Sequence, residues 1–119
     1  MVTQVTSFGR SGLSDWLVQR VTSLILLAYF LCVGATLISG VDYAAWSAMH
    51  ETSAMRVFTL LAALSLAAHA WIGMWAVFTD YLTERLMGPI GNLLRRLCQL
   101  GSFLALIIYV LWVVQILWR

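Results

Sequence analysis

The sequence predicts an all-α integral membrane protein with three transmembrane helices. Of its 119 residues, 62% are apolar and only 10% are charged, a balance far from that of a soluble domain of this size. Three apolar runs are each long enough to cross the roughly 30 Å hydrocarbon core of a bilayer as a helix. We therefore expect a single membrane domain with spans at about 16–39, 57–79 and 97–118.

The first element is a polar N-terminal segment, residues 1–15, which we expect to lie outside the membrane. No small-residue cleavage site follows the first apolar run, so we interpret the N-terminus as retained and not as a signal peptide. Ser14 is suited to cap the first span, and Trp16 and Arg20 lie near its start. An arginine there is by default a snorkelling topology anchor, and binding of an anionic group is the less favoured role.

The two connections between the spans differ in character. Residues 40–56 mix polar, apolar and aromatic side chains, which favours a short interfacial helix. His50 lies there, outside the hydrocarbon runs, so it is expected to be a solvated surface histidine. The second connection, 79–96, contains Gly-Pro-Ile-Gly at 88–91 and predicts a turn.

The distribution of arginine predicts how the helices are oriented. Five arginines lie before or near the start of the first span and in the second connection, and two lie in the first connection and the C-terminal tail. By the positive-inside rule, the N-terminus and the end of the second span are cytoplasmic, and the C-terminus is periplasmic. There is no lysine, and the arginines lie outside the apolar runs, so nucleic acid is not expected as a partner.

His69 lies near the centre of the second span and is the first candidate functional residue. An ionisable ring at that depth normally faces the protein interior and has a partner. On a helix, its azimuth within about 40° is shared by small or polar residues, namely Ala62, Ser65, Gly73, Ala76 and Asp80. Such a stripe allows a neighbouring helix to approach closely, and it equally leaves room for a flat ligand.

The residues leave two uses of His69 open. The spans contain no carboxylate and no second histidine, which disfavours a multi-ligand metal site, a proton path or a transporter lining. An axial haem ligand and a structural histidine that hydrogen-bonds a neighbouring helix both remain. A second haem ligand would come from another chain, since His50 lies at the wrong depth.

Asp80 and Tyr81 follow the last apolar residues of the second span. Taken singly, they are typical of a solvated aspartate and an interfacial tyrosine. Together they also suit a quinone headgroup, because a phenol can donate to a carbonyl while a carboxylate relays protons. Asp80 lies about 16 Å along the helix axis from His69.

The run from His69 to Tyr81, His-Ala-Trp-Ile-Gly-Met-Trp-x-Val-x-Thr-Asp-Tyr, resembles the second-helix signature of the SdhD family, the hydrophobic membrane anchor subunits of bacterial succinate dehydrogenase (complex II). The segment from Phe8 to Arg20 is similar to that family's approach to its first helix. The resemblance implies a helical bundle with a second membrane anchor subunit of the cytochrome b type, holding one haem b between them. It also implies an iron-sulfur subunit and a flavoprotein subunit at the inner membrane, and it is compatible with a trimer of such heterotetramers.

The resemblance also implies roles for single residues. His69 matches the axial ligand of the haem iron, and Arg20 matches an arginine that contacts a haem propionate. Tyr81 matches the tyrosine that hydrogen-bonds ubiquinone. Asp80 matches the acid beside that site, whose implied role is to deliver protons or to hold an arginine of a partner subunit. The implied function is that of an anchor subunit of succinate:ubiquinone oxidoreductase, with succinate oxidised on another subunit. The alternative is a structural or assembly subunit without a cofactor.

Overall fold

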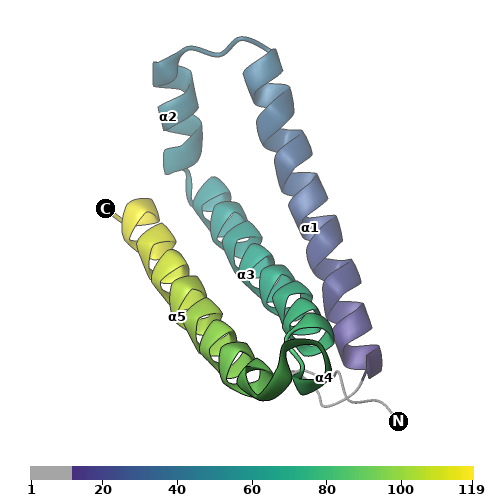
Figure 1. The fold of residues 1–119 in the computed structure, drawn as a ribbon. Coiled ribbons are helices and arrows are strands. Elements are labelled where there is room, and N and C mark those ends of the chain that lie inside the picture. Colours follow the sequence, from purple (N-terminus) through teal and green to yellow (C-terminus); the bar gives the residue numbers. More distant parts are fainter. Residues whose placement is uncertain (1–11) are drawn as a thin grey trace.

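The computed structural model describes residues 12–119, which form helices and turns without a β-strand (Figure 1). Three helices are long and apolar enough to cross a membrane, which confirms the predicted fold class of an all-helical protein with three candidate spans. The elements in chain order are α1 (Gly12–Ile38), α2 (Tyr43–Glu51), α3 (Ser53–Tyr81), α4 (Glu84–Met87), the 3₁₀ turn η1 (Gly88–Ile90) and α5 (Gly91–Leu117).

Two of the long helices include more polar residues than the apolar runs alone predict. The chain is already helical at Gly12, so Ser14 lies in the first turn of α1 and its prediction as the N-cap is wrong. Asp15 in the same turn interacts favourably with the positive end of the helix dipole. α3 begins at Ser53 because the Thr52 hydroxyl accepts a hydrogen bond from the Met55 amide at 3.2 Å. Residues 1–11 of the predicted N-terminal segment lie outside the described residues.

The predicted helix and turn are both present in the connections. α2 lies inside the segment 40–56, and the Asp42 carboxylate caps it by accepting from the Ala45 amide at 2.8 Å. The turn after α4 uses Gly88 at φ +74°, a conformation that favours glycine. A side chain at Gly91 would collide with the backbone carbonyl of Thr83, so glycine is required where α5 starts.

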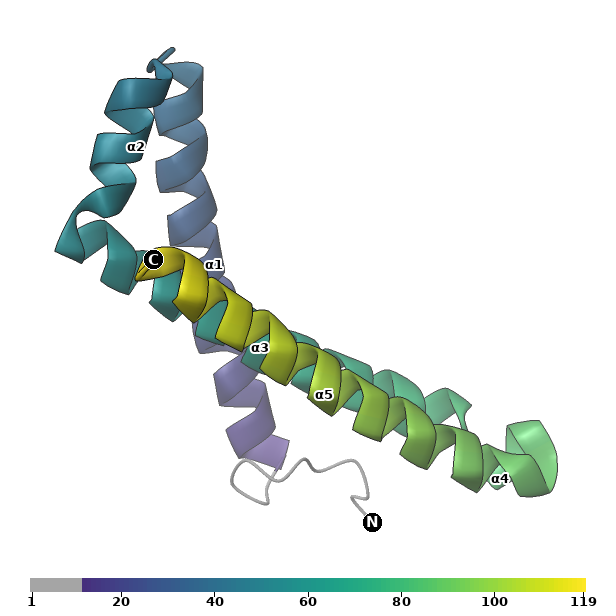
Figure 2. The same ribbon diagram turned by 90° about the vertical axis from the view of Figure 1, so that its left-hand side faces the viewer.

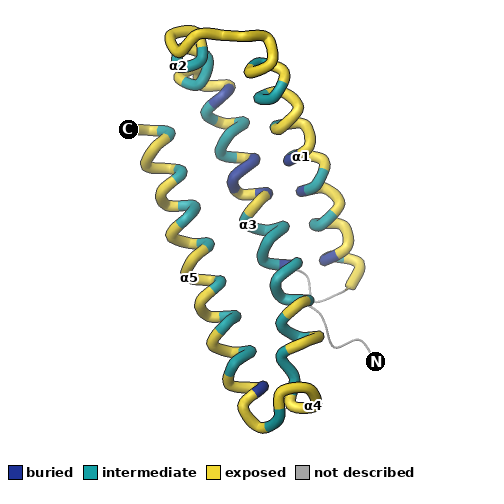
Figure 3. The backbone as a smooth tube through the Cα atoms, turned by 45° about the horizontal axis from the view of Figure 1, so that its top comes forward, coloured by how far each residue is buried: buried dark blue, intermediate teal, exposed yellow. Residues whose placement is uncertain are grey.

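α3 is the central helix of the bundle, with α1 on one side and α5 on the other (Figure 1). The view from the side shows α1 crossing the α3–α5 pair at a steep angle (Figure 2). Most of the buried residues lie on α1 and α3, and Gly91 is buried at the turn where α5 starts (Figure 3). Large apolar side chains are exposed along α1 and α5, as expected of helices that face lipid or partner subunits.

Candidate functional site

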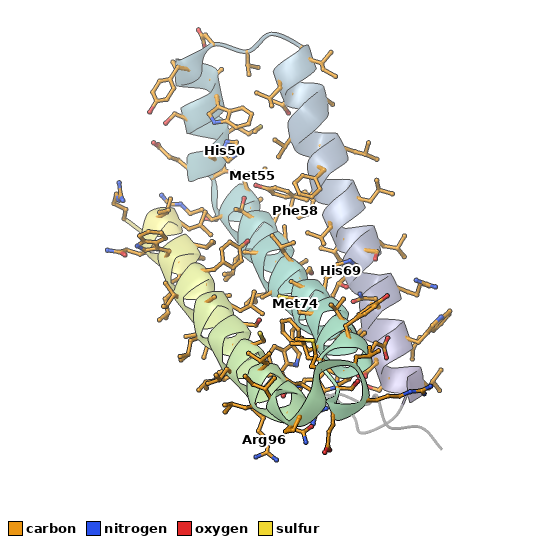
Figure 4. All side chains as sticks on the ribbon, in the orientation of Figure 1. His50, Met55, Phe58, His69, Met74 and Arg96 are labelled. Atoms are coloured by element: carbon orange, nitrogen blue, oxygen red, sulfur yellow. The ribbon has the colours of Figure 1, made fainter. Side chains whose placement is uncertain are left out.

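His69 lies in the second half of α3, half-buried, next to α1 (Figure 4). Its Nδ1 is 3.2 Å from the Thr22 hydroxyl and 3.5 Å from the Ser23 hydroxyl, both on α1. Within residues 12–119, the other ring nitrogen, Nε2, takes part in no hydrogen bond. The ring therefore has the protein partner that its depth requires, and one nitrogen remains available to a further ligand.

The two hydroxyls that face this ring are themselves held by α1. The Thr22 hydroxyl donates to the Val18 carbonyl at 2.7 Å, and the Ser23 hydroxyl donates to the Gln19 carbonyl at 2.6 Å. Donation to a carbonyl one turn back is the usual way for Ser and Thr to satisfy their proton inside an apolar helix. Thr22 is also buried, with 7% of its surface exposed, so its oxygen has a defined place beside the imidazole.

The stripe of small residues on α3 is used for close packing by α1. Ala62 and Ser65 are buried, and a methyl group added at Gly73 would come within 3.8 Å of the Gln19 side chain of α1. Of the two uses that the sequence left open for the stripe, the structure shows close helix approach at these positions. Ala76, one turn further along, lines a hollow instead.

This hollow is lined in part by Arg20, and on α3 it begins at Ile72, about one helical turn after His69. Its volume is about 220 Å³, below the roughly 300–1,000 Å³ of ligand pockets, so this chain alone does not enclose a large cofactor there. The Arg20 guanidinium lies 5.2 Å from the centre of the Trp16 ring, within the range of a cation–π interaction. The lining comprises Asp15, Trp16, Gln19, Arg20, Ile72, Trp75 and Ala76.

Two buried polar atoms in the same hollow lack hydrogen-bond partners among the described residues, Gln19 Oε1 and Trp75 Nε1. One is an acceptor and the other a donor, and a buried polar group without a partner costs about 1–3 kcal/mol. Sequence reasoning missed both residues, because each is unremarkable in an apolar helix until the two helices are brought together.

Asp80 and Tyr81 form the end of α3, and the side chains of both are exposed. They lie about 16 Å along the helix from His69, so the two candidate sites are neighbours on one helix without sharing atoms. A second hollow of about 410 Å³ opens near this end of α3. It is lined by Trp75, Thr79, Arg95, Arg96 and Gln99, so the short turn returns two arginines to the helix end.

His50 does not belong to the histidine site. Its Nδ1 donates to the Trp46 carbonyl at 2.9 Å, and its ring centre lies 4.3 Å from that of Trp46. His69 follows the start of α3 by about 24 Å of helix, whereas His50 precedes that start (Figure 4). The two rings lie much too far apart to bind one metal ion.

Three helices of this length and composition, with a half-buried histidine between two of them, define a class of small helical proteins suited to a membrane. No protein-family model matches the sequence. A curated protein from Coxiella burnetii (strain RSA 493 / Nine Mile phase I), the "succinate dehydrogenase hydrophobic membrane anchor subunit", is 37% identical over 111 residues, which cover 92% of this chain and 90% of that protein. The chain therefore belongs to the family of succinate dehydrogenase hydrophobic membrane anchor subunits, which confirms the family that the sequence predicts.

Proposed function

We propose that this anchor subunit provides one axial ligand of a b-type haem through His69 and part of a ubiquinone reduction site through Tyr81 and Asp80. The observation that carries the haem proposal is the His69 ring itself. Its Nδ1 is engaged by α1 hydroxyls, and Nε2 has no hydrogen bond within residues 12–119. In a ligating histidine, one ring nitrogen binds the metal and the other donates a hydrogen bond to a partner that orients the ring.

The surroundings of His69 also fit a haem. When bound, the haem supplies a one-electron redox centre whose potential depends on its axial ligands and their hydrogen bonds. Arg20 is suited to a propionate, because a guanidinium pairs well with a carboxylate. A second anchor subunit would supply the remaining protein ligand.

At the end of α3, the proposed chemistry is reduction of ubiquinone by two electrons and two protons. The Tyr81 phenol donates a hydrogen bond to a quinone carbonyl, which polarises it, and the Asp80 carboxylate passes protons from the aqueous side. Both side chains are exposed in this chain, so a neighbouring subunit closes the site. Electrons arrive from an iron-sulfur subunit below a flavoprotein, and ubiquinol leaves into the bilayer.

The proposed orientation puts this quinone site on the cytoplasmic side of the inner membrane. The first described turns of α1 and the α3–α5 connection lie at the same end of the bundle (Figure 1). Arg20, Arg85, Arg95 and Arg96 belong to that end, whereas Arg56 and Arg119 belong to the other. The fold is therefore compatible with the positive-inside rule for a cytoplasmic N-terminus.

The haem proposal is tested by His69→Ala in the assembled complex. The expected result is loss of the b-type absorption bands, because the axial nitrogen is gone. The matched control is His50→Ala, which removes a histidine bonded within its own helix and should leave the bands unchanged. An unaltered spectrum in the His69→Ala complex would refute the ligand role.

The quinone proposal is tested by Tyr81→Phe. Loss of one hydrogen bond of about 1 kcal/mol should slow ubiquinone reduction by several-fold to about tenfold, while succinate oxidation by an artificial acceptor is retained. Tyr43→Phe, at an exposed tyrosine on the other end of the bundle, is the control. Full ubiquinone reduction in Tyr81→Phe would contradict the role, and loss of both activities would indicate misassembly.

One observation favours the alternative of a structural anchor without a cofactor. The Thr22 and Ser23 contacts make His69 a hydrogen-bonded link between α1 and α3 on their own. The absorption spectrum of the unmodified complex separates the two functions, because a purely structural histidine gives no b-type band.

A further inference from the structure

The hydrogen-bond roles around His69 define which ring nitrogen carries the proton. A hydroxyl has one proton and two lone pairs, and the Thr22 proton is already directed to the Val18 carbonyl at 2.7 Å. The Ser23 proton is likewise directed to the Gln19 carbonyl at 2.6 Å. With these protons on the backbone carbonyls, both oxygens accept toward the ring, and the Nδ1–H of His69 is the donor.

A neutral imidazole with a proton on Nδ1 has its lone pair on Nε2. This is the tautomer that can bind a metal through Nε2. In water the two tautomers exchange freely, whereas here two acceptors, at 3.2 and 3.5 Å, lie only at Nδ1. Thr22 has the stronger effect on the tautomer, because its hydroxyl is closer to Nδ1 and only 7% of its surface is exposed.

We propose that Thr22, assisted by Ser23, is the positioning residue that holds His69 as the Nδ1–H tautomer and directs its Nε2 lone pair to the haem iron. This inference rests on the proposed haem function and adds a role for α1 in it. The α1 hydroxyls act through the histidine and do not touch the iron. Because an accepting oxygen draws the Nδ1 proton toward itself, Nε2 becomes a stronger electron donor.

A stronger donor favours ferric over ferrous iron, so the α1 hydroxyls lower the midpoint potential of the haem. Removing an outer partner of a ligating histidine typically changes metal affinity by about 10–100-fold. If ferric iron loses about tenfold more affinity than ferrous iron, the potential rises by about 59 mV for a one-electron couple.

The experiment is a redox titration of the b-type haem in the assembled complex, with its electron paramagnetic resonance spectrum as a second measurement. Thr22→Val combined with Ser23→Ala removes both acceptors at nearly constant shape. The expected result is a higher potential and shifted g-values of the low-spin ferric haem. The single variant Thr22→Ser keeps the hydroxyl, so its haem potential should equal that of the unmodified complex.

The matched control is Thr59→Val. Thr59 hydrogen-bonds Tyr29 at 3.1 Å and thus also joins α3 to α1, but it does not contact His69. An equal rise in potential in this control would show a structural effect and overturn the positioning role. If the double variant does not assemble, Thr22→Val alone is measured against Thr59→Val with the same two outcomes.

The results also separate this inference from the haem proposal. If the unmodified complex has no b-type band, both the haem proposal and the role of Thr22 and Ser23 are refuted. A band that disappears in His69→Ala, with a potential that stays unchanged when the α1 hydroxyls are removed, leaves the ligand in place and overturns only the role of Thr22 and Ser23.

Discussion

The two sides of α3 are held by different interactions. Toward α1, the contact includes buried small residues and two side-chain hydrogen bonds, one between Thr22 and His69 and one between Tyr29 and Thr59. Toward α5, an apolar groove of about 380 Å³ has the Trp71 and Phe103 rings edge to face at 5.9 Å. Its lining comprises Leu64, Ala67, Ala68, Trp71, Phe103, Leu106, Ile107 and Val110.

The difference shows which contact controls the candidate site. Lipid is as apolar as the side chains in the groove, so apolar contacts between helices give little preference for one register. A hydrogen bond exists in only one register, and close packing on small residues strengthens that choice. The position of the His69 ring therefore depends on α1, whereas the α3–α5 contact supports the bundle through shape.

The largest expected difference in the free energy of unfolding comes from placing a leucine on each of the two sides of α3. Ser65, on the α1 side, is 5% exposed, so Ser65→Leu should lower the free energy of unfolding by about 1–3 kcal/mol through overpacking. Ala67→Leu points additional carbon into the groove and should stay within about 0.5 kcal/mol of the unmodified protein. Unfolding of the purified complex in mixed micelles measures both, and equal losses would contradict the distinction.

A smaller effect is expected from the aromatic contact in the groove. Phe103→Leu keeps an apolar side chain but removes the ring interaction with Trp71, which is worth about 0.5–1.5 kcal/mol. A double-mutant cycle with Trp71→Leu isolates the pair energy. The haem potential should stay constant in all variants of this cycle, and a shift would show that the α5 side also controls the histidine.

The smallest expected effect is loss of the second hydrogen bond between α1 and α3. Thr59→Val should cost about 0.6 kcal/mol, the average for such bonds in membrane proteins. Tyr29→Phe should cost the same amount, and the two changes together should cost no more than either alone. Additive losses in the unfolding measurement would mean that the two hydroxyls do not bond to each other.

Much of the fold could be predicted because it follows from local properties of the chain. Apolar length predicts the three long helices, and the glycines at 88 and 91 predict the turn before α5. The helix starts were less accurate, since capping by Thr52 and the polar first turn of α1 extend helices beyond the apolar runs. His69 could be singled out, because an ionisable ring at lipid depth requires a partner.

The partner itself could not be predicted. Thr22 and Ser23 lie 47 and 46 residues away from His69, and a hydroxyl in an apolar helix is ordinarily satisfied by its own backbone. The unpartnered Gln19 and Trp75 atoms gave no signal either, since each becomes unusual only where α1 covers α3.

The sequence by itself determined that three helices are long and apolar enough to cross a membrane, and that His69 needs a polar neighbour. Those properties are sums over neighbouring residues, since each apolar side chain contributes independently to the transfer of a helix into lipid. Only the tertiary structure decided which hydroxyls meet the ring and which of its nitrogens they occupy. That choice depends on how two helices are rotated and shifted against each other, and no local stretch of sequence specifies it.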